Sequence, residues 1–236
     1  MINLKIKFKI DPKKDVFTFF DFLRDSQYDK GRNFEWAILK HYPYFKKFNG
    51  KVEKENVEDF VFKYYLKNKS IIEKNLIVYK KNWKKIEKDF FNFTNNLFSE
   101  TKWPKGKYVA YATMWSMYPR FLDNKTFQIP AVKRNKKIVS FIIAHEMLHF
   151  IFYEYFFSKY KKYRSHKYDF FSWHVSEIFN VIIMNKPDWQ KILKNKDDGY
   201  LEHRKIIKKL SNKNYELDDL IDNIIKEVDR IIIKKI

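Results

Sequence analysis

The sequence contains no cysteine. Disulfide scaffolds, cysteine nucleophiles, iron–sulfur clusters and zinc sites built from thiolates are therefore excluded. Glycine and proline are also scarce, with 4 and 6 among 236 residues, which argues against collagen-like and linker-rich chains. Any metal site in this chain must use histidine and carboxylate side chains.

The chain also lacks a long apolar run free of charge. Its most apolar stretch, residues 138–157, contains two histidines and two glutamates, whereas a membrane span needs ~20 mostly apolar residues with few charges. The first ten residues, MINLKIKFKI, have alternating lysines instead of the apolar core of a secretory signal. We therefore expect a cytoplasmic protein with no membrane span.

Arginine is rare although the net charge is +20, because the chain has 42 lysines and only 7 arginines. Recognition of base edges and phosphates relies strongly on the planar guanidinium group. The lysines are spread over the chain and do not form a basic motif. The composition thus predicts general attraction to polyanions but no specific nucleic-acid partner.

Hydrophobic residues make up 45% of the chain and aromatic residues 19%, enough for a sizeable core. We expect one domain over residues 1–236, in which residues 1–100 form a mainly helical N-terminal subdomain. In residues 1–10, apolar side chains alternate with polar ones, which predicts a half-buried strand. Helical periodicity then predicts helices at residues 16–28, 34–48, 57–64 and 70–97, the last capped by Ser70.

The second half of the chain begins with short segments typical of strands. KYVAYAT, SMYPR and TFQIPA lie within residues 107–131 and are separated by turn residues such as Asp123 and Asn124. Helices are predicted at residues 136–160, at 170–185 before Pro187, and at 217–233. The order of strand, helices, small sheet and helices predicts a mostly helical α+β fold with a small mixed or antiparallel sheet.

The segment IIAHEMLHF carries the clearest chemical signal. His145 and His149 are four residues apart, slightly more than one helical turn, so they share one helix face. Their imidazoles can bind one Zn²⁺ at about 2.0–2.1 Å, and Glu146 can reach a water molecule on that ion. This is the HExxH arrangement of zinc hydrolases.

A catalytic zinc site needs a third protein ligand. The continuation HExxHxxGxxH is absent, because Phe152 and Tyr155 stand where glycine and histidine would be required. The candidates lie in FFSWHVSEIFN, where Glu177 follows His149 by 28 residues, enough for a loop and an antiparallel helix. His174, three residues before Glu177, is the alternative ligand.

With these residues, the chain resembles the gluzincin group of zinc metallopeptidases, the thermolysin-like architecture. The resemblance covers roughly residues 107–185 and implies that His145, His149 and Glu177 bind zinc while Glu146 is the general base. It also implies a zincin-like domain in which the sheet packs on the HExxH helix, with residues 101–236 as the metallopeptidase core.

The chain departs from this group four positions after Glu177. The family has an acidic residue there, whereas this chain has Val181, and Asn180 is the nearest polar residue. A looser likeness links the chain to small cytosolic HExxH peptidases that cleave repressors, in which the second helix pairs glutamate with asparagine and ends at a proline. Pro187 fits that pattern.

Several further side chains are candidates for the site. His174, Asn180 and Tyr153 could support the ligands or contact substrate, although Tyr153 could equally be a core residue. The tetrahedral oxyanion of peptide hydrolysis needs a second donor. Candidates for this donor are His203 and Tyr200, followed by His166 and His174.

These observations favour a zinc-dependent metallopeptidase that acts on a peptide or protein substrate. An extended substrate would pair with an exposed edge of the sheet formed by residues 107–131, because main-chain pairing makes few demands on side chains. The alternative is a non-catalytic basic binding protein of zincin-like fold, with nucleic acid or protein as its partner.

Overall fold

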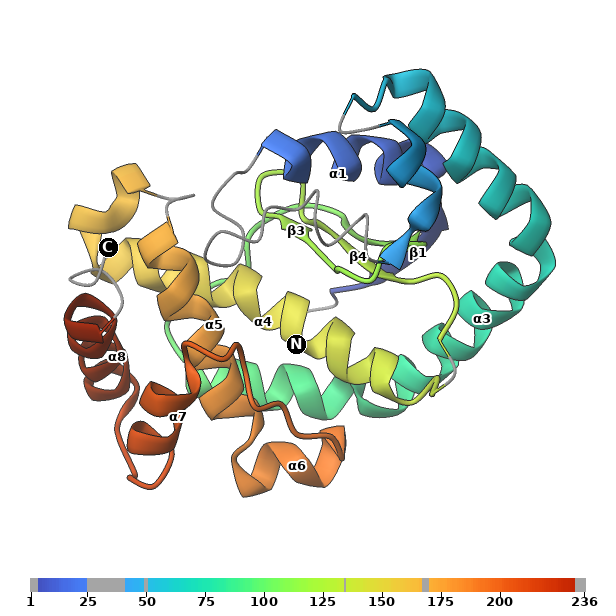
Figure 1. Cartoon of the computed structure of the whole chain (residues 1–236). Coiled ribbons are helices and arrows are strands. Elements are labelled where there is room, and N and C mark those ends of the chain that lie inside the picture. The colour runs from blue at the N-terminus through green and yellow to red at the C-terminus, as the bar shows by residue number, and fades with distance from the viewer. Residues whose placement is uncertain (1–3, 25–40, 49–50, 134, 167–169, 232–236) are drawn as a thin grey trace. The chain divides into compact units, whose positions relative to one another are not determined.

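The computed structural model describes residues 4–24, 41–48, 51–133, 135–166 and 170–231. It is mostly helical with one small mixed sheet (Figure 1), which confirms the predicted α+β class. Three parts of the predicted helices, at residues 25–28, 34–40 and 232–233, lie outside the described residues. The elements, in chain order, are β1 (Ile6–Ile10), α1 (Pro12–Arg24), η1 (Pro43–Phe48), α3 (Lys54–Leu97), β2 (Tyr108–Thr113), β3 (Arg120–Phe121), β4 (Thr126–Pro130), α4 (Ile138–Lys159), η2 (Lys161–His166), α5 (Phe170–Met184), α6 (Pro187–Leu193), α7 (Arg204–Leu210) and α8 (Leu217–Ile231).

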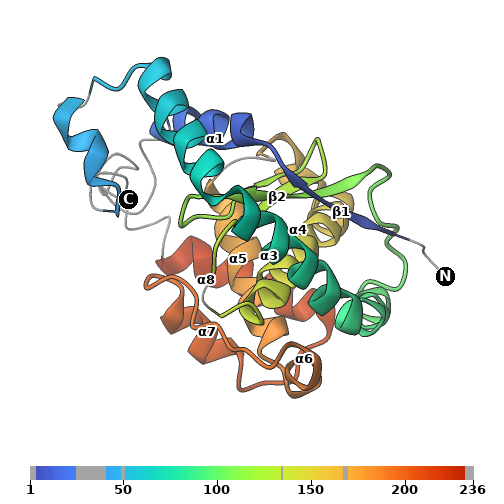
Figure 2. The ribbon, with the colours of Figure 1, turned by 90° about the vertical axis from the view of Figure 1, so that its right-hand side faces the viewer.

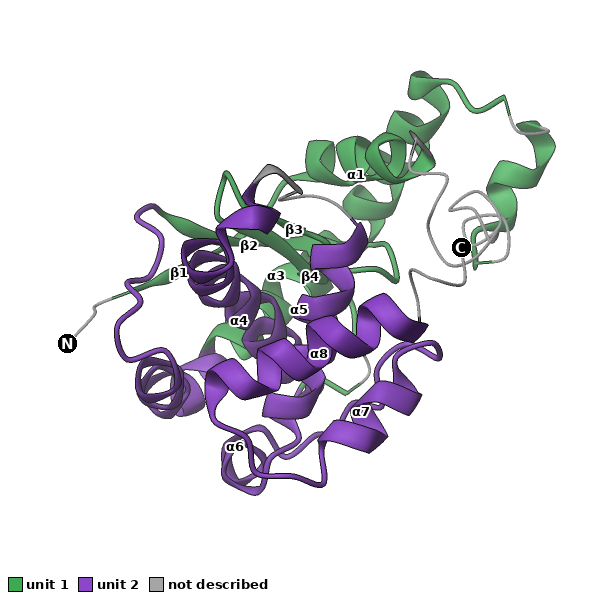
Figure 3. Ribbon diagram, turned by 90° about the vertical axis from the view of Figure 1, so that its left-hand side faces the viewer, with its two compact units in different colours: residues 1–80, 107–136 green, residues 81–106, 137–236 purple. Residues whose placement is uncertain are grey.

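The chain forms two compact units that interleave in sequence (Figure 3). Unit 1 consists of Met1–Lys80 and Lys107–Lys136, and unit 2 of Lys81–Gly106 and Lys137–Ile236. The sheet belongs to unit 1, whereas the HExxH segment belongs to unit 2. The expected packing of the sheet on that helix therefore stays a prediction.

The sheet of unit 1 has the strand order β1-β2-β4-β3. β1 and β4 both pair with β2 in parallel, and β3 pairs with β4 antiparallel. The segment SMYPR yields only the two-residue strand β3, because Pro119 has no N–H for a ladder and contributes only its carbonyl, which accepts from the Gln128 N–H at 2.9 Å. Since β2 and β4 are interior, β3 is the edge strand that residues 107–131 provide.

Helix α3 is one continuous helix of 44 residues where the sequence predicted two. Ser70 is exposed inside it and does not cap a helix start. Neither glycine nor proline interrupts residues 54–97, and one buried stripe continues along the helix through Val57, Tyr65, Tyr79 and Phe90. Without a helix-breaking residue, the periodic pattern is satisfied by a single helix.

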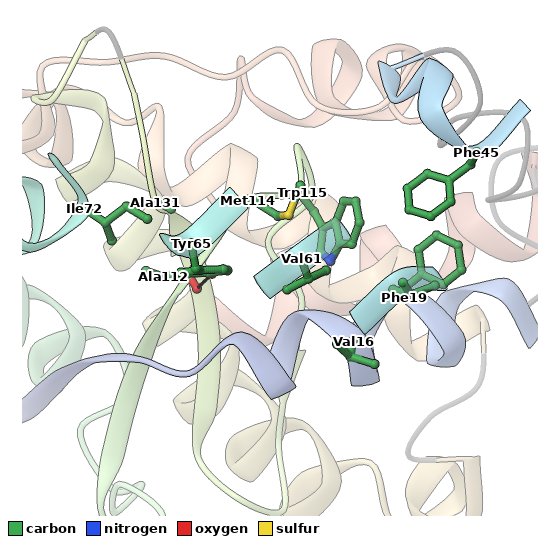
Figure 4. Close-up of a cluster of buried hydrophobic side chains, with 11 residues drawn as sticks. Val16, Phe19, Phe45, Val61, Tyr65, Ile72, Ala112, Met114, Trp115 and Ala131 are labelled. Carbon is green, nitrogen blue, oxygen red and sulfur yellow. Dashed lines mark hydrogen bonds between the residues drawn. The ribbon is translucent and has the colours of Figure 1, made fainter. Parts of the chain in front are cut away.

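The core of unit 1 is a cluster of apolar and aromatic side chains that come mainly from α1, α3 and the sheet (Figure 4). Phe19 of α1 contacts the rings of Phe45 and Trp115 at centroid distances of 5.1 and 5.7 Å. Val61 of α3 and Ala112 of β2 are completely buried in the same cluster. Burial of these large side chains stabilises unit 1 and fixes α1 and α3 against the sheet (Figures 1 and 4).

Unit 2 is built around α4 and α5, which are buried along most of their length. Helix α5 ends at Met184 and α6 begins at Pro187, a residue that suits the first turn of a helix, so the predicted stop is confirmed. Helix α8 packs its apolar face on α5 and α7, and α7 is a short helix that the sequence did not predict. Among the described residues, no helix is both long enough and apolar enough to cross a lipid bilayer.

A buried carboxylate connects the elements of unit 1. Asp15 is fully buried in the first turn of α1 and accepts hydrogen bonds from the Met114 N–H at 2.8 Å and the Gln128 side-chain amide at 3.1 Å. Burial raises the pKa of Asp15 from 3.8 to about 7, against the opposing effect of its hydrogen bonds.

The hydroxyl of Tyr65 supports a protonated Asp15. It lies 2.9 Å from Asp15 Oδ2 and 2.5 Å from the carbonyl oxygen of Ala112. Tyrosine has a single hydroxyl hydrogen, which can serve only one of these oxygens. When the Tyr65 hydroxyl donates to the Ala112 carbonyl, a proton on Asp15 can form the hydrogen bond between Asp15 Oδ2 and the Tyr65 oxygen.

The first prediction concerns the pH dependence of stability. Because folding raises the pKa of Asp15, its protonated form stabilises the folded state fully below about pH 4, and this contribution is lost as the pH rises to about 7. The loss amounts to about 4 kcal/mol at most. Urea unfolding followed by tryptophan fluorescence should show wild-type stability falling relative to Asp15→Asn between pH 4 and 7. A constant difference between the two proteins over this range would contradict the assignment.

Candidate metal centre

Helices α4 and α5 pack against each other and carry the predicted ligands. His145 and His149 lie one turn apart on α4, with ring centroids separated by 4.7 Å and the rings nearly perpendicular. Glu177 projects from α5 toward both rings. Most of the other side chains that α4 and α5 bury are apolar. The structure thus brings together residues from two separate sequence segments.

The three side chains converge through defined atoms. Glu177 Oε2 lies 3.1 Å from His145 Nε2, and Glu177 Oε1 lies 3.3 Å from His149 Nε2. The two Nε2 atoms are 3.1 Å apart. Within the part of the chain that the structure describes, no other group of three such side chains has this proximity.

The histidine pair has a spacing that suits a tetrahedral zinc ion. With ligand bonds of about 2.0–2.1 Å, the edges of a coordination tetrahedron measure about 3.3–3.4 Å, and the two Nε2 atoms are 3.1 Å apart. Each Glu177 oxygen faces one of the two rings, and one ligand atom from each of the three residues lies within 4.8 Å of the others. His149 and Glu177 are buried, whereas the His145 side chain is 14% exposed. Three protein ligands leave a fourth position for water, the pattern of catalytic zinc sites.

Glu146 follows His145 on α4 and is buried. It does not belong to the group formed by His145, His149 and Glu177. The predicted role of Glu146 as general base remains a prediction.

Asn180 connects α5 to the backbone of the ligand helix. Its side-chain amide donates to the carbonyl oxygen of His145 at 3.1 Å, and the side chain is fully buried. This bond fixes α5 relative to α4 one turn after Glu177. The structure shows a contact through which Asn180 can support His145, and a contact of Asn180 with substrate stays a prediction.

Tyr153 lies one turn after His149 and supports that residue from behind. The two rings stack with centroids 6.2 Å apart, and the Tyr153 hydroxyl lies 2.9 Å from the hydroxyl of Ser176 on α5. The tyrosine is buried. It therefore lies in the core beside His149, and a role of Tyr153 at the site stays a prediction.

His174 does not join the metal group but pairs with His203. Their Nδ1 and Nε2 atoms are 2.6 Å apart, and both rings are buried. Burial lowers the pKa of His203 to about 4, an effect that the nearby Glu177 carboxylate partly opposes, so His203 is neutral at pH 7. Of the two candidates for the third ligand, Glu177 is the one that meets the histidine pair.

The His174–His203 contact was not predictable from spacing. It depends on the turn at Gly199, whose positive φ of 69° suits glycine and where a Cβ would lie 2.6 Å from the Ile207 side chain. This turn precedes His203, whose ring also contacts that of Tyr200. The chain has only four glycines, and the one at position 199 was the only sequence signal of an unusual backbone conformation in this segment. The side chain of His166, a further candidate, lies outside the described residues.

The second prediction concerns zinc binding. Isothermal titration of the metal-free protein should show one Zn²⁺ per chain, and the affinity should fall at least 100-fold in His149→Ala and Glu177→Ala, because each removes a ligand atom. His174→Ala is the matched control and should stay within about threefold of wild type, since its contact is to His203. Retention of zinc by Glu177→Ala together with its loss from His174→Ala would show that His174, and not Glu177, is the third ligand.

Comparison of the chain with protein-family models, with curated proteins and with solved structures found no significant match.

Proposed function

We propose that this protein is a zinc-dependent metallopeptidase that hydrolyses peptide bonds. The observation that carries the proposal is the convergence of His145, His149 and Glu177, each of which offers one ligand atom within 4.8 Å of the others, from two helices that are otherwise mostly apolar. The HExxH resemblance to gluzincins supports the same assignment. A peptide or protein substrate and a cytoplasmic location belong to this proposal.

In this mechanism, His145, His149 and Glu177 would hold a zinc ion. A bound zinc ion would supply a Lewis acid and would lower the pKa of a water molecule to about 7. Glu146 would accept a proton from the attacking water molecule and would then give it to the leaving amine. Asn180 and Tyr153 hold α4 and α5 in register, through the His145 carbonyl and the Ser176 hydroxyl respectively.

His203 is our candidate for the donor that stabilises the developing oxyanion. Its neutral ring can carry one N–H, and its Nε2 is already engaged with His174. The position of the proton between His174 Nδ1 and His203 Nε2 determines which ring nitrogen of His203 carries the N–H that can donate to the oxyanion. Tyr200 is the alternative donor, because it is 40% exposed and its ring lies 5.4 Å from that of His203.

The third prediction tests the general base. Glu146→Gln should bind zinc as wild type does but lose about 10³-fold in kcat/KM on fluorescently labelled casein, because the amide cannot accept the proton. Glu154→Gln is the matched control, since Glu154 is exposed on the same helix, and it should retain full activity.

Two results would contradict this mechanism. Cleavage of casein by Glu146→Gln at the wild-type rate would remove Glu146 from the chemistry. A protein without zinc affinity that binds polyanions, with an affinity that falls steeply with salt, would favour the alternative of a non-catalytic basic binding protein.

The fourth prediction identifies the oxyanion donor. His203→Ala should lower kcat about 10²-fold with little change in KM or zinc content, because the lost hydrogen bond acts in the transition state. Tyr200→Phe should leave kcat within about threefold of wild type. The reverse pattern would assign the donor to Tyr200, and unchanged kcat in both variants would exclude this pair.

A further inference from the structure

The contact between His174 and His203 links the ligand-bearing helix α5 to a second helix of unit 2. His174 lies on α5, three residues before Glu177, and His203 immediately precedes α7, which packs on α5 (Figure 2). Both imidazole rings are buried, and His174 Nδ1 lies 2.6 Å from His203 Nε2. The helix that carries the candidate third ligand therefore also contacts the candidate oxyanion donor.

The short distance between these two ring nitrogens requires one hydrogen atom between them. At 2.6 Å, two bare nitrogens would face each other with their lone pairs, and two N–H groups would clash. Either ring can supply the hydrogen, so two arrangements satisfy the contact. In the first, His174 Nδ1–H donates to His203 Nε2. In the second, His203 Nε2–H donates to His174 Nδ1.

The two arrangements differ in what the other nitrogen of His203 can do. Burial lowers the pKa of His203 to about 4, so the ring is neutral at pH 7 and carries a single N–H. If that N–H is at Nε2, then Nδ1 is bare and cannot donate to an oxyanion. If Nε2 accepts from His174, the N–H is at Nδ1.

His203 Nδ1 is the nitrogen that the protein itself leaves unused. No residue that the structure describes forms a hydrogen bond with it, and the side chain does not cap the first turn of α7. The nitrogen is buried, but the ring of Tyr200, which packs against that of His203, is 40% exposed, so the neighbouring surface borders on solvent. A buried N–H without an acceptor is unfavourable, and a substrate oxygen that accepts from it relieves this cost.

We propose that His174 is a positioning residue whose Nδ1–H donates to His203 Nε2 and so holds His203 as the tautomer with its hydrogen on Nδ1. The inference rests on the proposed function, because this tautomer matters only if His203 donates to the oxyanion. His174 then acts through His203 and needs no contact with zinc or substrate. In the proposed reaction, His203 Nδ1–H stabilises the developing charge while His174 keeps Nε2 occupied.

The first test observes the tautomer directly and needs no enzymatic activity. Long-range proton–nitrogen NMR spectra of the isotope-labelled, metal-free full chain distinguish a protonated ring nitrogen from a bare one. Wild type should show His203 protonated at Nδ1 and bare at Nε2, and His174 protonated at Nδ1. The signals are assigned by their loss in His174→Leu and His203→Ala, and the exposed ring of His41 is the reference for an unconstrained histidine.

Variants of His174 then test whether it selects this tautomer. In His174→Leu, no donor faces Nε2, so His203 should populate the Nε2–H form as the His41 ring does. His174→Asn should keep the Nδ1–H form, because its side-chain amide can still donate. Thermal unfolding confirms that each variant is folded.

The second test is a double-mutant cycle on casein cleavage. His174→Leu should lower kcat at least about tenfold and leave KM and zinc affinity within about threefold of wild type, because the lost hydrogen bond acts in the transition state. The double variant His174→Leu/His203→Ala should lose no more than His203→Ala alone, since His174 acts through His203. His174→Asn should recover most of the wild-type kcat.

Two results would overturn the inference. Wild-type protein with the hydrogen of His203 on Nε2 would do so whether or not the protein cleaves peptides. Losses that multiply in the double variant would show that His174 acts without His203. Nδ1–H on His203 in a protein that cleaves no peptide would instead reject the proposed function and leave the tautomer assignment in place, so the two failures are distinguishable.

Discussion

The packing of α4 against α5 is the constraint on which the candidate site depends. Burial of imidazole and carboxylate groups in an apolar interior costs several kcal/mol unless they find partners. His149 and Glu177 are nevertheless buried among mostly apolar side chains. Together with His145 they form the candidate metal group, and each of the two faces the other and His145. The contact of Asn180 with the His145 carbonyl holds the two helices at the register at which this is possible. A shift of one residue along either helix would leave buried polar groups without partners.

How far the sequence predicted this site depends on the range of each interaction. The pair His145 and His149 follows from helix geometry alone, because four residues span one turn. Glu177 required the resemblance to gluzincins, since no local rule relates a residue in α5 to one in α4. The pairing of His174 with His203 was beyond both arguments. It arises from the backbone at Gly199 and from α7, a helix whose seven residues include four basic ones and give little periodic signal.

The fold shows the same division between local and distant interactions. Alternation in residues 1–10 predicted β1, and the turn residues at positions 123 and 124 predicted the connection before β4. The placement of β1 next to β2, about a hundred residues later in the chain, was not predicted. Nor was the hydrogen-bond network of Asp15, whose partners Met114 and Gln128 lie equally far away. Periodicity reports which face of an element is buried, but it does not report which partner covers that face.

The excess of lysine illustrates how structure gives meaning to composition. As a total, +20 predicts only general attraction to polyanions, and the scarcity of arginine argues against specific readout of bases. Charge becomes selective where it is combined with shape. The lysines of β1 and α3 are spread over the exposed faces of these elements, and Lys63 pairs with Asp59 on its own helix. Charge distributed in this way attracts polyanions without selecting among them.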